Sequence, residues 1–294
     1  MENAKILVTG ANGQLGTEIS AALADRYGSR NIITTDIIPK GRNTSIQHEV
    51  LDVSNVAQLQ NMVRKHKITQ IYHLAATLSL VAEEDPGRAW KLNFNSLLNV
   101  LETAALFDLE RGLCRWYFEK KGVDVRSIRY PGVISSKVLP GGGTTDYAVD
   151  IFHYALRREN YICPLQHNEP LPMIYISDAV RAALESMEAV PEQITERGSY
   201  NIGGFSCTPQ YFEIIYQPGP PQKIAGGWPN SIDDSQARDD WNWHPAFDLP
   251  KTTRDMLGNL ARDWADDHSD QTTDYMKVAK LHVRTECRQF IALV

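Results

Sequence analysis

The sequence predicts an α/β fold built on a parallel β-sheet. Short apolar runs of strand length alternate with longer segments whose apolar residues recur at helical spacing, and the first of these runs meets a glycine-rich turn at once. Strands and helices that alternate in this way form parallel sheets with right-handed crossover connections. The 294 residues are enough for one large domain or for two domains.

The first half of the chain repeats a strand, a turn and a helix. The apolar run at 5–9 is the first predicted strand, and a helix over 14–27 follows it. A second strand over 31–35 ends at Asp36, and the run at 48–53 leads into a helix capped by Ser54. The other predicted elements of this half are a strand at 71–74 and a long helix at 86–107.

The alternation is interrupted after residue 107, because residues 108–121 have helical spacing where a buried strand is expected. It then resumes. The predicted strands of the second half lie at 123–129 and 199–202. The predicted helices are one opened by residues 140–146 that runs to about 157, and others near 177–189, near 233–241 and between 241 and 264.

Composition and charge narrow the classes of partner. The net charge is −6 and Lys and Arg form no cluster, so we expect no nucleic-acid partner, which would need a basic face. The four cysteines lack ligand spacing, so we expect reduced thiols and no metal site. No apolar run has membrane-spanning length and Met1 leads directly into the first strand, so we expect a soluble cytoplasmic protein with no membrane partner.

A glycine-rich turn joins the first strand to the first helix. In its G-x-x-G-x-x-G spacing, the first glycine allows the turn, the second lets a pyrophosphate approach the backbone, and the third lets helix and strand pack closely. Free N–H groups and the helix dipole then stabilise the phosphates. The alternative is a glycine-rich turn without a ligand. The motif residues expected to bind a dinucleotide are Gly10, Asn12, Gly13, Gln14, Leu15 and Gly16.

Acidic residues further along refine this prediction. Asp36 closes the second strand, where its carboxylate can accept hydrogen bonds from both hydroxyls of the adenosine ribose. The same carboxylate repels a 2′-phosphate, so NAD is the expected cofactor rather than NADP. Asp52 and Val53 are placed to contact the adenine; alternatively, they form a helix-capping loop. The fold class is therefore a Rossmann-type, doubly wound parallel sheet, with a small C-terminal substrate-binding region.

Further motifs carry a family resemblance. With the string Tyr72-His-Leu-Ala-Ala76, the helix bearing Asn93 and the turn Arg129-Tyr-Pro-Gly132, the chain resembles the extended short-chain dehydrogenases/reductases, which are epimerase/dehydratase-like. Longer strings narrow the resemblance to the NAD-dependent L-threonine 3-dehydrogenases rather than the sugar-nucleotide epimerases. These strings lie at 122–135, 140–152 and 228–243, and the run GGGTTDYA is the most specific.

The resemblance implies that the protein oxidises the β-hydroxyl of L-threonine to give 2-amino-3-oxobutyrate, with hydride passing to NAD. By analogy, Thr144, Thr145 and Asp146 face the substrate together with Ser79; the alternative for the first three is a helix cap. The residues implied to contact the cofactor are Leu74, Ala75, Ala76 and Asn93, with Pro131 and Ile134 lining the nicotinamide pocket.

These assignments give a domain plan. We expect an NAD-binding Rossmann domain over 1–135, with an apparent deletion near 108–114. A substrate-binding region over 136–264 is interleaved with the last Rossmann strands, and a tail over 265–294 has no assigned role.

The catalytic segment of the family has no counterpart in the expected place. Family members use a tyrosine, a lysine four residues on and a Ser or Thr, and about 45 residues of that region are missing here. Tyr117 and Lys121 have the literal spacing, but Tyr117 lies only 12 residues before Arg129. In the family this separation is about 26 residues, and the difference displaces the tyrosine by roughly 20 Å along a helix. The catalytic residues are therefore unknown.

The missing segment includes a strand that the family places between the first strand and the strand at 123–129. Either the sheet closes over this gap, or the sequence omits residues that the natural protein has. A smaller gap, of about a dozen residues, is expected after Gln210.

The sequence leaves three functions open. The first is an active NAD-dependent L-threonine 3-dehydrogenase whose sequence is incomplete here or whose site is rebuilt, and which is otherwise inactive in this form. The second is a catalytically dead NAD-binding relative that acts through a protein partner, and the third is a sugar-nucleotide epimerase-like enzyme. A homodimer is a further expectation, because the superfamily pairs long helices, although only the helix at 86–107 is complete here.

Overall fold

The computed structural model describes residues 4–77, 79–106, 123–124, 126–139, 141, 143–209 and 214–267. Contacts divide the chain into two compact units. Unit 1 comprises Met1–Tyr130, Ile176–Ile202 and Asp233–His244, and unit 2 comprises Pro131–Tyr175, Gly203–Ile232 and Pro245–Val294. Each unit is therefore assembled from several segments of the chain.

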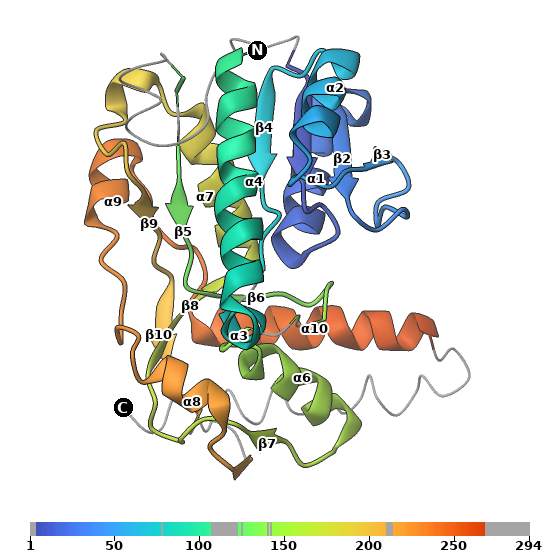
Figure 1. Cartoon of the computed structure of the whole chain (residues 1–294). Coiled ribbons are helices and arrows are strands. Elements are labelled where there is room, and N and C mark those ends of the chain that lie inside the picture. Colours follow the sequence, from blue (N-terminus) through green and yellow to red (C-terminus); the bar gives the residue numbers. More distant parts are fainter. Residues whose placement is uncertain are drawn as a thin grey trace. The chain divides into compact units, whose positions relative to one another are not determined.

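Unit 1 contains a parallel sheet with the strand order β3-β2-β1-β4 (Figure 1). In register, Ile6 lies opposite both Ile32 and Gln70. This sheet confirms the predicted α/β fold class. Its strands are β1 (Ile6–Thr9), β2 (Ile32–Asp36), β3 (Gln47–Val50) and β4 (Gln70–His73).

Helices cover both faces of this sheet. Successive residues of β1 point to opposite faces, so Leu7 packs into one core cluster whereas Ile6 and Val8 pack into another. The Leu7 cluster includes residues of α2 and α4, and the other includes residues of α1 and α7. This two-sided packing is the doubly wound arrangement that the sequence predicts. These helices are α1 (Gln14–Tyr27), α2 (Val56–His66), α4 (Pro86–Leu106) and α7 (Ile176–Glu188).

The sheet does not close over the predicted gap within the described residues. β4 pairs only with β1, and β5 (Ile128–Arg129) pairs instead with β9 (Tyr200–Asn201) in a separate parallel pair. The other elements of unit 1 are the short helices α3 (Ser79–Glu84) and α9 (Ser235–Trp241) and 3-10 turns at Ser29–Asn31 and Pro191–Gln193.

A buried arginine ties the segment before β5 to the end of α7. The side chain of Arg126 is fully buried and donates to the carbonyls of Ser186 and Ala189, and its Nη2 lies 2.8 Å from Asp124 Oδ2. Arg197 binds the other oxygen of Asp124 at 2.9 Å. The guanidinium of Arg126 is thus paired with a carboxylate and two carbonyls, as a buried charge requires.

Unit 2 contains a sheet with the order β10-β8-β6 and a pair of short strands, β7 and β11. Helix α10 packs against α6. The hydroxyl of Tyr175 donates to Asp255 Oδ2 at 2.5 Å, which ties β8 to α10. The bounds are β6 (Gly132–Ile134), α6 (Tyr147–Arg157), β7 (Ile162–Cys163), β8 (Leu171–Tyr175), β10 (Phe205–Cys207), β11 (Ile215–Tyr216), α8 (Pro220–Ala225) and α10 (Leu249–Asp267).

Some predicted element boundaries are wrong. Helix α2 is capped by Asn55, whose side chain accepts from Gln58 N, because the side chain of Ser54 instead donates to Asp52 Oδ1. The strand predicted at 123–129 is reduced to β5, and the last helix continues to Asp267, beyond the expected start of the tail. In the described ranges, no helix has the length and apolar character needed to cross a lipid bilayer.

Candidate functional site

The glycine-rich turn has the conformation that the motif predicts. Gly10 adopts a φ of 65°, which disfavours residues with a side chain. A Cβ at Gly10 would also lie 2.7 Å from the backbone of Ala75, so the turn packs directly on the chain that follows β4. The turn is further fixed by Ala11 N, which donates to Thr35 O at 3.0 Å.

The other two glycines of the turn have different roles. Gly13 is exposed and precedes the first turn of α1, where no side chain caps the helix N terminus. A Cβ at Gly13 would meet only Gly10 O, at 3.3 Å, whereas one at Gly16 would lie 2.3 Å from the same oxygen. Gly13 therefore leaves backbone open to a phosphate, and Gly16 lets α1 pack against the turn.

Asp36 lies at the end of β2, beside the turn. Its Oδ2 accepts from Asn12 N at 3.1 Å and its Oδ1 accepts from Ile38 N at 3.2 Å. A carboxylate has about four acceptor positions, so hydrogen bonds from the ribose hydroxyls can still be accepted. The structure thus brings Asp36 to the glycine-rich turn, as the prediction requires.

The remaining predicted cofactor residues of the turn are placed around α1. Asn12 is buried and its side chain bonds to the loop after β2. Gln14 and Leu15 are half-buried in the first turn of α1, where Leu15 packs against the core.

Asp52 and Val53 form the loop before α2. Asp52 Oδ1 accepts from the backbone N and the hydroxyl of Ser54, at 2.9 and 2.6 Å. Val53 is buried in the core, and its carbonyl accepts from Asn99 Nδ2 at 3.0 Å. This is the geometry of the helix-capping alternative, and the contact with adenine stays a prediction.

The chain after β4 forms the opposite wall of the turn. Leu74 N donates to Thr9 O at 3.2 Å, and Leu74 and Ala75 are half-buried, whereas Ala76 is exposed. Asn93 on α4 holds this segment through the backbone of Thr77, with hydrogen bonds of 2.7 and 3.1 Å. Asn93 therefore positions the loop that approaches the turn.

Sequence reasoning missed His73, which links three elements of unit 1. Its Nδ1 lies 2.8 Å from Thr9 Oγ1 on β1, and its Nε2 lies 3.2 Å from Ser96 Oγ on α4. Burial lowers the pKa of His73 to about 4, so the ring is neutral near pH 7. A histidine at the end of a buried strand was the available signal.

The predicted substrate residues of unit 2 gather where β6 meets the start of α6. A Cβ at Gly132 would lie 2.7 Å from Cβ and Cγ2 of Thr145 and 2.6 Å from the sulfur of Met173. Gly132 thus allows Thr145 to pack onto β6. Pro131 and Ile134, the predicted nicotinamide contacts, are both buried on either side of this position.

Acidic groups surround the first turn of α6. Asp146 Oδ2 accepts from Gly143 N at 2.7 Å, and Thr144 is buried beside it. Burial and the nearby charge of Asp146 raise the pKa of Asp150. This hydrogen bond orders the turn before α6. Asp146 is the N-cap residue of α6, but its side chain makes no capping hydrogen bond.

The side chains of the remaining candidate residues are not among the described parts of the structure. Ser79 begins α3, and its side chain is not described. Tyr117 and Lys121 lie outside the described residues, as does the region of the apparent deletion. No cluster of metal-binding side chains occurs in the part of the chain that the structure describes.

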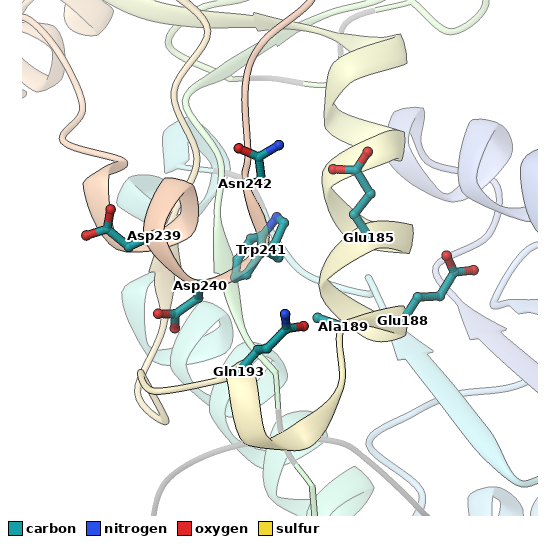
Figure 2. A pocket seen from close by; sticks show the side chains of 8 residues that line it. All are labelled: Glu185, Glu188, Ala189, Gln193, Asp239, Asp240, Trp241 and Asn242. Carbon is teal, nitrogen blue, oxygen red and sulfur yellow. The ribbon is translucent and has the colours of Figure 1, made fainter.

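A hollow of about 410 Å³ in unit 1 is lined mainly by acidic and amide side chains (Figure 2). Three of its four carboxylates bind other groups of the protein: Glu188 binds Arg26, Glu185 binds Arg181, and Asp240 is hydrogen-bonded as follows. Asp240 accepts from Thr195 N at 2.8 Å and from the hydroxyl of Tyr200. These contacts tie α7 to α1 and tie the end of α9 to Thr195 and Tyr200.

The turn, the Asp36 carboxylate and the two-sided sheet define an NAD-binding protein of the extended short-chain dehydrogenase/reductase type. Residues 6–118 match the NAD dependent epimerase/dehydratase family. An uncharacterized epimerase/dehydratase of Staphylococcus saprophyticus is 35% identical over 306 residues, which cover 86% of this chain and 96% of the relative. The chain belongs to the NAD-dependent epimerase/dehydratase family, and its cofactor is NAD.

Solved structures of threonine dehydrogenases resemble the chain closely. The holo form of a GalE-like L-threonine dehydrogenase from Cupriavidus necator is 46% identical, with a TM-score of 0.85 over 87% of this chain and 99% of that chain. An L-threonine dehydrogenase from Clostridium difficile is 34% identical, with a TM-score of 0.84 over 88% and 98%. A UDP-glucose 4-epimerase from Thermotoga maritima, 17% identical with a TM-score of 0.75, shares the fold.

The comparison also shows a difference in length within the aligned region. The alignment to the Staphylococcus saprophyticus relative spans 306 residues, whereas 86% of this 294-residue chain is about 253 residues. About 50 positions of the alignment therefore have no counterpart here. This difference agrees in size with the two gaps that the sequence predicts.

Proposed function

We propose that this protein binds NAD and L-threonine as an L-threonine 3-dehydrogenase, which oxidises the β-hydroxyl of the substrate. The observation that carries the proposal is the packing of Thr145 on Gly132 beside the ordered Asp146, in a chain 46% identical to a threonine dehydrogenase. Bound NAD would supply the hydride acceptor. The chain's own residues would hold the cofactor on the glycine-rich turn and the substrate at the start of α6.

The chemistry of the Thr144 to Asp146 run suits an amino acid. Threonine hydroxyls and N–H groups at a helix N terminus favour a carboxylate, and Asp146 can accept a hydrogen bond from an ammonium group. Pro131 and Ile134 are buried apolar residues that suit the nicotinamide ring. These features support substrate binding, and they leave the proton acceptor of the reaction unassigned.

A second candidate function is a catalytically dead NAD-binding relative. Two observations favour it. Tyr117 lies too close to Arg129 in the sequence to take the place of the family's catalytic tyrosine. About 50 aligned positions also have no counterpart in this chain. The unpaired side of β4 in the described residues agrees with a missing strand. An epimerase-like function has weaker support, since the UDP-glucose 4-epimerase from Thermotoga maritima is 17% identical.

Two measurements on one sample distinguish these functions. Calorimetry tests NAD binding, and absorbance at 340 nm after addition of NAD and L-threonine tests NADH formation. NADH formation supports the dehydrogenase. Protein that binds NAD but forms no NADH contradicts it and supports the dead relative. An intact mass about 5–6 kDa above 33.1 kDa would show that the natural protein contains the missing segment.

Substitutions test the substrate residues. We expect Thr145→Ala and Asp146→Ala to weaken L-threonine binding by about tenfold, because each removes a charge-assisted or polar contact. Asp263→Ala, at an exposed carboxylate on α10, is the matched control. Unchanged threonine affinity in both variants, with NAD binding intact, would reject this assignment.

The proposal includes a homodimer formed through α4. Trp90 and Phe94 are 67% and 48% exposed, and their rings stack with centroids 5.1 Å apart. Leu98 continues this apolar stripe one turn further along the helix. An exposed apolar stripe of this kind is typical of a protein interface.

A further inference from the structure

We propose that Arg42 is a second determinant of cofactor choice, poised to bind a 2′-phosphate that Asp36 repels. The inference rests on NAD as the cofactor and on the position of Asp36 at the adenosine ribose. It adds a cationic residue whose effect opposes that of the carboxylate. The preference of this protein for NAD would then be a balance between two fixed charges.

Both charged residues bind the same residue of the glycine-rich turn. Asn12 N donates to Asp36 Oδ2 at 3.1 Å. Arg42 Nε donates to Asn12 O at 2.9 Å, and Arg42 N donates to Asn12 Oδ1 at 3.1 Å. The guanidinium is therefore held at the turn, next to the residue that holds the ribose-binding carboxylate.

The loop that carries Arg42 is fixed by contacts on both sides. Asn12 Nδ2 donates to Lys40 O at 3.1 Å, so the polar groups of this buried asparagine all bond to Asp36 or the loop. Nε2 of His48 lies 2.9 Å from Ile38 O, and the same ring lies 2.8 Å from the position of a Cβ at Gly41. The position of Arg42 thus does not depend on a bound ligand.

The guanidinium keeps donors for a ligand. Arg42 is exposed, and among the described residues it forms an ion pair neither with Asp36 nor with any other carboxylate. Of its five N–H donors, the one on Nε is engaged at Asn12, and the four on the terminal nitrogens have no partner there. A planar group with such donors is suited to bidentate binding of phosphate.

The two charges predict a specific response to cofactor chemistry. A 2′-phosphate beside an ionised Asp36 is repelled, and this outweighs the attraction of an exposed arginine. When Asp36 is replaced by a neutral residue of the same shape, the attraction of Arg42 remains. NADP binding should then become tighter without any added basic residue.

The test compares dissociation constants for NAD and NADP by isothermal titration calorimetry. In Asp36→Asn we expect NADP to bind about tenfold more tightly than in the wild type, because a charge repulsion is removed. Adding Arg42→Gln to that variant should reverse the gain by about tenfold. Arg42→Lys should retain part of the gain, since it keeps the charge but loses the planar fork.

Controls separate this proposal from a general charge effect. Arg30→Gln removes an exposed arginine at the opposite end of β2 and should leave NADP affinity unchanged. The proposal is wrong if the double variant binds NADP as tightly as Asp36→Asn, or if Asp36→Asn gains no affinity for NADP.

One comparison does not depend on the folding of Asp36→Asn. Arg42→Gln alone should raise the ratio of the NADP to the NAD dissociation constant by about tenfold. An unchanged ratio overturns the proposal. NAD affinity within about threefold of the wild type would show that the turn remains intact, and loss of NAD binding altogether would show that Arg42 acts on the turn and contradict its role in discrimination.

Discussion

Alanine substitutions at Gly13 and Gly16 should separate folding from cofactor binding. At Gly16 an added Cβ would lie 2.3 Å from Gly10 O and 2.6 Å from Ala11 Cα, and both neighbours are backbone atoms. At Gly13 the nearest atom would be 3.3 Å away, and the backbone φ of −71° is one that alanine adopts readily. The two methyl groups thus meet different obstacles within one turn of helix.

The expected magnitudes follow from these distances. Because the clashing atoms are backbone, overpacking at Gly16 should cost about 2–3 kcal/mol, of which the helix preference of alanine offsets about 1 kcal/mol, so the net loss is about 1–2 kcal/mol. For a domain of this size, the melting temperature should fall by roughly 2–8 °C. Gly13→Ala should change the free energy of unfolding by less than about 0.5 kcal/mol. Its effect should fall on NAD, since the methyl group occupies the path of the pyrophosphate, and affinity should fall by about tenfold or more.

Thermal denaturation and NAD calorimetry on both variants check this reasoning. A Gly13→Ala protein that is as stable as the wild type and binds NAD within twofold would show that the phosphates do not pass over Gly13. A Gly16→Ala protein with an unchanged melting temperature would show that α1 does not need close contact with the turn.

Three further predictions concern stability and assembly. Gly258→Ala on α10, where a Cβ would meet nothing within 4 Å, should stabilise the protein by up to about 1 kcal/mol in urea unfolding. Burial lowers the pKa of His73 to about 4, so the neutral ring contributes fully to the free energy of unfolding above about pH 6.5. This contribution is lost as the pH falls toward 4. That loss is about 3 kcal/mol and should be absent in His73→Asn, so equal acid sensitivity of the two proteins would contradict it. Trp90→Glu should convert a dimer to a monomer in analytical ultracentrifugation, and a monomeric wild type would reject the α4 interface.

The sequence predicts the nucleotide-binding half well because its signals are local. Gly10 and Asp36 are predicted from a strand, a turn, a helix and a second strand that follow one another along the chain. In the structure β1 pairs with β2, and Asn12 of the glycine-rich turn donates to the Asp36 carboxylate. Periodicity also finds α1 and α4 to within about one residue.

Other features depend on tertiary contacts that local patterns do not contain. The role of Arg42 arises from a loop folded back on Asn12, and no spacing rule connects these two residues. Ser54 is as good a helix cap as Asn55, and only its competing bond with Asp52 decides between them. The sequence does not predict strand β8, because Pro172 lies within its apolar run and proline disfavours strand interiors. In the structure Pro172 nevertheless lies opposite Ser206 of β10.

The buried Arg126 constrains the order in which this protein can fold during translation. The ribosome delivers Arg126 about 60 residues before the carbonyls of Ser186 and Ala189 that receive it, and β5 waits longer still for β9. Until then the Arg126 guanidinium and the edge of β5 lack their final partners, which favours a late and cooperative folding of unit 1. A shortened gene that ends near residue 135 would therefore encode the glycine-rich turn without α7, the helix that packs with α1 against one face of the sheet.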